Sequence, residues 1–310
     1  MSGLLHRRPS LSARIAITAV AAVSMAASIA CVSVSTSGRS AAPAASAPAN
    51  PKASQDGAHE RTLQTSLDDP KSLDVDVENG SITVVRDDSL KSMQVTVVVG
   101  DRSDSGSDSD SHRAAVQGAT LVAERDSSGQ VKVRVKLPGL GIIRSNPPST
   151  KVTVRTPGLS DVRAESMNGS IRTEGDLGKL ALETTNGSID AAGAASVVAK
   201  TTNGSVEISG ATSLARAETM NGKIRIAVPE GSKAVIDAES VNGGITLEIP
   251  ASWDGEIDAS TTHGRLRITD IDGTTTPDIT GATFRREAAS GSPAKAKLDV
   301  TNGSITLKRP

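Results

Sequence analysis

Aliphatic residues recur at fixed distances on either side of a series of Asn-Gly pairs. The third residue after the asparagine is aliphatic in all eight repeats, and the fifth after, the fourth before and the sixth before are usually aliphatic too. Alternation at every second position predicts short β-strands with one buried face. The repeats are centred on Asn79, Asn168, Asn186, Asn203, Asn221, Asn242, His263 and Asn302, so histidine replaces asparagine once.

The positions between these aliphatic residues are polar, and we expect them to face outward. The fourth residue after the asparagine is often charged, as in Arg172, Asp190, Glu207, Arg225 and Arg267. The third residue before it forms a second polar row: Asp76, Glu165, Glu183, Lys200, Glu218, Glu239, Ser260 and Asp299. Each repeat therefore predicts two alternating strands around a turn.

The spacing of the repeats bears on how those strands pair. An Asn-Gly link is typical of a type I′ hairpin, and the alternation fits a hairpin as well as one coil of a stack. From position 168 to 263, however, the steps are a near-constant 18, 17, 18, 21 and 21 residues. In-register parallel stacking would place like residues on each other and let the asparagines form a hydrogen-bonded ladder. We therefore predict an all-β repeat fold, a β-solenoid similar to a single-stranded β-helix, with rungs of about 18 residues.

Residues 63–310 are predicted to form one domain. Its N-terminal part has less regular spacing, and we expect it to form broader coils. The segment 73–84 closely echoes 298–307, which predicts that these two rungs cap the ends of the stack. The segment 274–295 interrupts the period and is expected to be a surface excursion. The irregular strands are predicted at 93–99, 120–124, 130–137 and 151–155.

The N-terminus predicts export and tethering. Residues 1–31 have the arginine-rich start and uncharged stretch of a signal peptide or membrane anchor. Cys31 follows a small residue, as a lipid-attached cysteine does in a bacterial lipobox, whereas extending the apolar run through Val34 would suit an uncleaved transmembrane anchor. Residues 32–62 are rich in Ala, Ser and Pro and are predicted to be a disordered linker. We expect a membrane-tethered protein of the bacterial cell envelope with an extracytoplasmic domain.

Composition narrows the function classes. A net charge of −1 and an aromatic content of 1% argue against a nucleic-acid partner and against aromatic stacking platforms for ligands. One cysteine and four widely separated histidines leave no disulfide framework and no metal-ligand cluster. We therefore predict no metal and no cofactor.

The outward charges allow an enzyme hypothesis. Several β-solenoid enzymes cleave acidic polysaccharides with clustered carboxylates and Arg or Lys. The outward rows here hold the same residue types: Glu165, Glu183, Lys200 and Glu218, near Arg163 and Arg216. Mixed charge also keeps an exposed sheet soluble and deters edge pairing, and nothing in the sequence marks a cleft. His263 occupies the turn column, where we expect it to tolerate a positive φ. No catalytic residue is predicted.

The serial turns carry a family resemblance. The Asn-Gly-Ser-Ile and Asn-Gly-Ser-Val turns, together with the Val-Pro-Glu-Gly-Ser run at 228–232, resemble the bacterial putative-adhesin β-strand-repeat domain, a family of unknown function that includes LiaG-like envelope proteins. The resemblance covers about residues 63–310. It implies a β-helix-like solenoid at the envelope, an adhesive or scaffolding role, and no catalytic residues. The turns concerned begin at Asn79, Asn168, Asn186, Asn203 and Asn302.

These observations predict a non-enzymatic adhesin or scaffold that binds a cell-wall or extracellular glycan, or an envelope protein, through its charged side walls. One alternative is a β-helix carbohydrate-active enzyme acting on an acidic polysaccharide, which a concave cluster of acidic and basic side chains would favour. Another is an envelope-stress accessory protein that works through a partner. An exposed aliphatic strip or an uncapped end rung would favour that third function.

Overall fold

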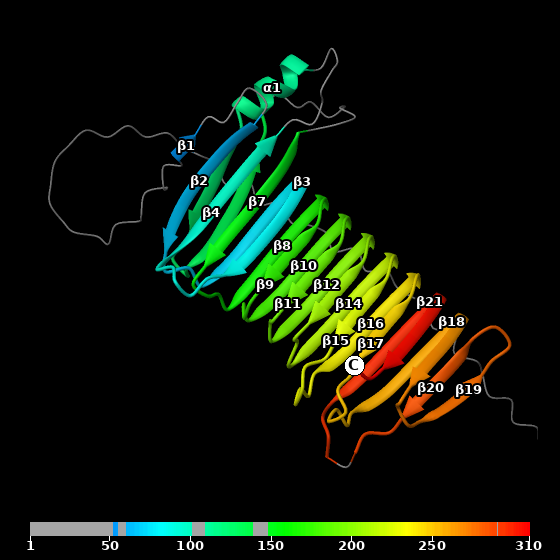
Figure 1. Cartoon of the computed structure of the whole chain (residues 1–310). Coiled ribbons are helices and arrows are strands. Elements are labelled where there is room, and N and C mark those ends of the chain that lie inside the picture. Colours follow the sequence, from blue (N-terminus) through cyan, green and yellow to red (C-terminus); the bar gives the residue numbers. More distant parts are fainter. Residues whose placement is uncertain (1–51, 55–59, 101–108, 139–147, 290) are drawn as a thin grey trace, which may run out of the picture. The chain divides into compact units, whose positions relative to one another are not determined.

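The computed structural model describes residues 52–54, 60–100, 109–138, 148–289 and 291–310. These residues form β-strands almost throughout, with one helix, α1 (Ser109–Gln117), so the all-β prediction is confirmed (Figure 1). The predicted signal or anchor, 1–31, including Cys31, lies outside the described residues. No helix within the described ranges is both long enough and apolar enough to cross a membrane.

The central repeats each supply a long strand that ends at the asparagine and a short strand that begins three residues later. We call the row of long strands the long arm and the row of short strands the short arm. The long strands are β8 (Asp161–Asn168), β10 (Lys179–Asn186), β12 (Ser196–Asn203), β14 (Leu214–Asn221) and β16 (Val235–Asn242). The short strands are β9 (Ile171–Glu174), β11 (Ile189–Ala192), β13 (Val206–Ser209), β15 (Ile224–Ala227) and β17 (Ile245–Glu248).

Each of these strands pairs in parallel with its equivalent in the neighbouring repeats (Figure 1). The register is constant, with Asn186 opposite Asn168 and Asn203, and Ile189 opposite Ile171 and Val206. Because an interior strand uses both of its edges for these neighbours, the hairpin alternative is wrong. The predicted parallel, in-register stacking is confirmed.

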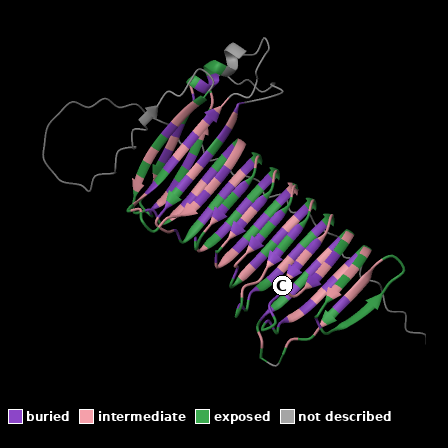
Figure 2. Cartoon of the chain, viewed as in Figure 1, coloured by how far each residue is buried: buried purple, intermediate pink, exposed green. Residues whose placement is uncertain are grey.

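The core consists of aliphatic columns. Along most of each central strand, buried inward residues alternate with outward residues that are intermediate or exposed (Figure 2). Ile171, Ile189, Val206, Ile224 and Ile245 stack on one another with at most 1% of each exposed. Burying one such side chain contributes about 1.5–3 kcal/mol. A single rung cannot enclose its own apolar side, so the rungs are stable only as a stack.

The C-terminal rung does not lie at the end of the stack. Strand β21 (Lys295–Lys308) pairs on one side with β16 and β17 and on the other with β18 (Glu256–Thr269). Asn302 therefore lies between Asn242 and His263, although His263 follows Asn242 in the sequence. The prediction that 298–307 is an end cap is wrong. Because all rungs share the same residue columns, this rung can stack beside any of them. The period of the sequence therefore does not determine the spatial order of the rungs.

The N-terminal rung, 73–84, which resembles 298–307, does not lie at the end of the stack either. Strand β3 (Ser72–Arg86) pairs with β8 and β9 on one side. On the other side it pairs in parallel with β6 (Gln130–Lys136) along the long arm and with β7 (Ser149–Thr156) along the short arm. The cap prediction for 73–84 is therefore wrong as well.

Beyond β6 and β7 the pairing becomes antiparallel, so the predicted broader coils are wrong. Strand β4 (Ser92–Gly100) pairs with β7, β2 (Glu60–Asp68) with β4, and β5 (Thr120–Arg125) with β6. Of these pairs, only β5 and β6 are joined directly by a tight turn, as antiparallel neighbours can be. In the β5–β6 turn, for example, the Asp126 carboxylate accepts hydrogen bonds from the backbone N–H groups of Ser128 and Gln130 at 2.9 and 3.0 Å.

Strand structure also enters the predicted linker. Strand β1 (Lys52–Ser54) pairs antiparallel with β2, which itself begins at Glu60. Strand β1 lies wholly and β2 partly inside 32–62, so strand structure occurs at 52–54 and 60–62 within the range predicted to be a linker. The Ala, Ser and Pro content of 32–62 gave no reason to expect this pairing of β1 with β2.

Among the described residues, strands close the C-terminal end of the stack along the long arm only. Strand β20 (Ala282–Arg286) pairs antiparallel with the first half of β18, and β19 (Thr274–Pro277) pairs with β20. The predicted excursion 274–295 is thus partly sheet. Phe284 lies opposite Ala259 with 1% exposed, and the Arg286 guanidinium lies 5.8 Å from the ring centre of buried Trp253. Both aromatic residues therefore close an end of the stack, while the rungs themselves hold only smaller side chains.

Candidate functional site

The predicted turn residues form one column along the stack. Each asparagine Nδ2 donates to the Oδ1 of the preceding rung's asparagine at 2.7–3.0 Å. His263 extends the column beside Asn302. The expected positive φ at His263 is wrong, since Asp69 and Asp270 are the only described non-glycine residues with one. In spatial order the column is Asn79, Asn168, Asn186, Asn203, Asn221, Asn242, Asn302 and His263.

The glycine after each asparagine is required by the closeness of the rungs. A Cβ built on Gly204 would lie 1.9 Å from the carbonyl oxygen of Gly187, and one on Gly187 would lie 2.0 Å from that of Gly169. Neither central glycine has a positive φ. The Asn-Gly signal therefore reflects stacking and not the type I′ turn that the pair often indicates.

A second ladder lies behind the turns. The hydroxyls of Thr184 and Thr201 donate to the carbonyl oxygens of Gly169 and Gly187 at 2.9 and 3.0 Å. Sequence reasoning missed this ladder, although a hydroxyl residue two places before the turn residue was visible in six of the eight repeats. These residues are Ser166, Thr184, Thr201, Thr219, Ser240 and Thr261, and each is buried.

Val300 interrupts the hydroxyl ladder. It is 3% exposed and occupies the place of Thr201 in its own rung, facing Gly243. Val300→Thr is expected to raise the free energy of unfolding by about 0.5–1.5 kcal/mol, because the new hydroxyl can donate to the Gly243 carbonyl. Thr201→Val should lower it by about 1–3 kcal/mol, since it leaves a buried acceptor unpaired. Urea denaturation of both variants checks this; two changes of the same sign would contradict the ladder.

Two side-chain columns run along the outer wall of the long arm. The acidic column lies three residues before the turn residue and, in spatial order, comprises Asp76, Glu165, Glu183, Lys200, Glu218, Glu239, Asp299 and Ser260. The rim column lies one residue before it and comprises Glu78, Met167, Thr185, Thr202, Met220, Val241, Thr301 and Thr262.

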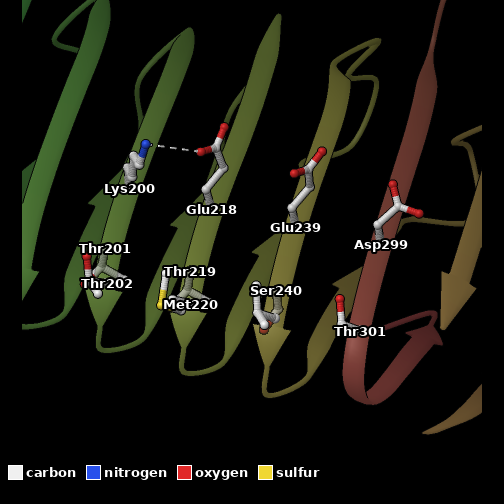
Figure 3. Close-up of a pocket in the computed structure, with 11 residues that line it drawn as sticks. Lys200, Thr201, Thr202, Glu218, Thr219, Met220, Glu239, Ser240, Asp299 and Thr301 are labelled. Atoms are coloured by element: carbon white, nitrogen blue, oxygen red, sulfur yellow. Dashed lines mark ion pairs between the residues drawn. The ribbon is translucent and has the colours of Figure 1, made fainter. Parts of the chain in front are cut away.

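Shallow grooves lie along these two columns. One, of about 260 Å³, spans β12, β14, β16 and β21, and another, of about 200 Å³, spans β3, β8 and β10. Figure 3 shows the carboxylates of Glu218, Glu239 and Asp299 in one row, with Met220 and Thr301 in a second row nearer the turns. Both grooves combine the same two columns, so we treat them together as the long-arm groove.

Most carboxylates of the acidic column pair with basic side chains. Lys200 Nζ lies 3.7 Å from a Glu218 carboxylate oxygen, and Lys297 Nζ lies 2.8 Å from Asp299 and 3.9 Å from Glu239. The hydrogen bond to Asp299, with the attraction of that carboxylate, raises the pKa of Lys297. Asp76 pairs with Arg134 at 2.8 Å, and Glu165 pairs with Arg163. Of the six acids in the column, only Glu183 lacks a basic partner among the described residues.

The rim column exposes apolar side chains that do not take part in the core. Met167 and Met220 are 56% and 52% exposed, and Val241 is 42% exposed. Flexible, polarizable methionines adapt to varied contact surfaces. The groove therefore offers carboxylates along one side and apolar contacts along the other.

Charges on the outer wall of the short arm also pair with one another between rungs. Arg172 lies 3.6 Å from Asp190 on the next rung, and Arg225 lies 3.6 Å from Glu207 and 2.8 Å from Glu248. Acids and bases are mixed along the short arm, whereas six of the eight positions of the acidic column are Asp or Glu. Across the described ranges, no group of three or more His, Cys, Asp or Glu side chains is placed to hold a metal ion.

The residues of the enzyme hypothesis do share one wall. Glu165, Glu183, Lys200 and Glu218 follow one another along the acidic column. A glycosidase acid, however, is usually kept protonated by burial in a cleft. None of these three carboxyl side chains is buried. The arrangement suits contact with a partner better than proton transfer.

Comparisons place these features beside known proteins. Residues 163–277 match the model of a domain of unknown function, DUF7330. No curated protein matches the chain. Similar crystal structures include a putative cell adhesion protein from Clostridium sporogenes ATCC 15579, with 11% identity and a TM-score of 0.33, over 84% of this chain and 100% of that one.

Two further structures are similar at the same level. A putative adhesin from Bacteroides fragilis NCTC 9343 has 12% identity and a TM-score of 0.32, over 81% of this chain and 97% of that one. A putative lipid binding protein from Parabacteroides distasonis ATCC 8503 has 12% identity and a TM-score of 0.27, over the same shares of the two chains. Likeness at this level assigns neither a function nor a partner.

Proposed function

We propose that the chain is a non-enzymatic, adhesin- or scaffold-like β-solenoid of the bacterial cell envelope that binds a glycan or protein partner in the long-arm groove. In this proposal residues 1–31 provide export and, by lipidation of Cys31 or as an uncleaved anchor, attachment to the membrane. The Ala/Ser/Pro-rich part of 32–62 separates the stack from that membrane. The in-register stacking of successive rungs supports the solenoid.

The repetition of the groove carries this proposal. The same two columns continue over the seven strands β3, β8, β10, β12, β14, β16 and β21, at the spacing of about 4.8 Å between neighbouring strands. Such a surface offers many similar, individually weak contacts in a line. An extended polymer can use all of them, whereas a small molecule can use only a few.

A binding screen with the full-length protein tests the proposal. Cell-wall and extracellular polysaccharides and envelope proteins would be assayed both for retention and for release of fragments. Met220→Lys is expected to weaken retention at least fivefold, because it places a cation and a longer side chain in the groove. Ile279→Lys is the matched control, since Ile279 is 98% exposed and lies outside the groove, in the turn between β19 and β20.

Each outcome is decisive for one function. Retention that falls in Met220→Lys and not in Ile279→Lys supports a binding scaffold. Release of shortened glycan would overturn it and favour the β-helix enzyme acting on an acidic polysaccharide. Equal retention by both variants would show that the partner binds outside the groove.

A further inference from the structure

The short arm has an open end at the C-terminal side of the stack. The second half of β18 pairs on one side with β21, as in Leu266 with Ile305 and Ile268 with Leu307. On its other side, pairing with β20 stops at Thr261, and the last backbone hydrogen bond runs from Gly264 N–H to the Thr280 carbonyl. Within the described residues, no strand covers the outer edge of Leu266–Thr269, which we call the open edge.

Aliphatic side chains are incompletely covered at the open edge. Leu266 and Ile268 continue the inward columns of Ile305 and Leu307, which are 0% exposed. Unlike those two residues, Leu266 and Ile268 are only half-buried. One more strand at this edge would complete their burial.

The other three ends of the two arms are covered. At the N-terminal side, β6 covers the long-arm part of β3 and β7 covers its short-arm part. At the C-terminal side, β20 covers the long-arm part of β18. The unpaired edge is therefore particular to one end of one arm.

The charge at the open edge indicates what could pair there. Arg265 and Arg267 are exposed, and no described acidic side chain forms an ion pair with either of them. Arg172 and Arg225, which occupy the column of Arg267 in other rungs, both pair with carboxylates. The terminal rung thus lacks the acidic neighbour that the central rungs have.

We propose that the open edge binds an extended peptide segment of a partner protein by strand addition. The segment would carry acidic side chains outward, beside Arg265 and Arg267, and aliphatic side chains inward, over Leu266 and Ile268. Strand addition gains affinity from main-chain hydrogen bonds and specificity from alternate side chains. This site is separate from the long-arm groove.

A second copy of the chain is a poorer occupant. Pairing of two open edges would bring Arg265 and Arg267 of both copies side by side, and like charges at neighbouring positions destabilise strand pairs. An acidic strand would instead place carboxylates beside these arginines, and opposite charges stabilise a strand pair. The proposal therefore commits to an acidic partner segment.

The test uses the full-length protein and an acetylated, amidated peptide of alternating glutamate and isoleucine. Fluorescence anisotropy should show saturable binding, and hydrogen exchange of the amides at 265–269 should slow when the peptide is present. Arg267→Glu is expected to weaken binding at least tenfold and to create binding of the matching lysine–isoleucine peptide. Lys223→Glu is the matched control, because Lys223 is exposed and occupies the column of Arg265 in a central rung.

Three results would overturn the proposal. If the glutamate–isoleucine peptide does not bind saturably, or binds wild type and Arg267→Glu equally, the open edge does not bind an acidic strand. Dimerisation by sedimentation, with the amides at 265–269 already protected before peptide is added, would assign the edge to a second copy. Met220→Lys should leave peptide binding unchanged, which separates this test from that of the groove.

Discussion

Gly204→Ala is expected to lower the free energy of unfolding by at least about 3 kcal/mol, the upper range for forcing extra volume into a packed site. Its Cβ would lie 1.9 Å from the Gly187 carbonyl oxygen, which is backbone and cannot rotate away. Relief would require the rungs on either side to separate, which would lengthen the asparagine ladder and weaken the strand pairing. Chemical denaturation followed by circular dichroism measures the change.

Gly158→Ala is the control for the same chemical change. No atom lies within 4 Å of a Cβ built on Gly158, and its φ is not positive. We expect a change within about 0.5 kcal/mol, as for most surface substitutions. If the two alanine variants unfolded at the same denaturant concentration, the close approach of the rungs at the turn would be wrong.

Ile189→Asp is expected to destabilise the stack by at least about 4 kcal/mol. Ile189 is 1% exposed and lies between Ile171 and Val206, so an aspartate there would lose the apolar burial and place an unpaired charge in the core. Because each rung is stabilised by its neighbours, several rungs should open together. Hydrogen exchange should therefore show lost protection on both sides of β11, and not in β11 alone.

Glu183→Gln in the same repeat is the companion variant. Glu183 is outward and exposed, and we expect a change of less than about 0.5 kcal/mol. A loss like that of Ile189→Asp would contradict the assignment of inward and outward faces, on which the long-arm groove depends.

The sequence predicted the columns and not the order of the rungs. A buried column needs the same residue type in each rung, so repetition at 171, 189 and 206 leaves a direct trace in the sequence. The order in which rungs stack leaves no such trace. The rungs of Asn302 and His263 have the same pattern of columns, so either could lie beside the rung of Asn242. The antiparallel ends also escaped prediction, since their strands lack the repeat that marks the centre.

The candidate site was predictable only in part. Alternation placed Glu183 and Glu218 on an outer face, and the structure agrees. It did not reveal that the grooves follow this row, or that Met167 and Met220 form the other side of them. In the sequence each methionine occupies a position that is threonine in four other repeats, and only the stacking of the rungs brings the two into one line.

The position of β21 has a consequence for biosynthesis. Strand β21 is synthesised after β16, β17 and β18, between which it lies, so these strands cannot reach their final pairing until β21 has emerged. Until β21 emerges, the edges of β16 and β17 lack their final neighbour, and β18 presents the same columns as β21. If β18 pairs with β16 and β17 first in the nascent chain, it has to give up this place to β21 before the stack reaches its final order.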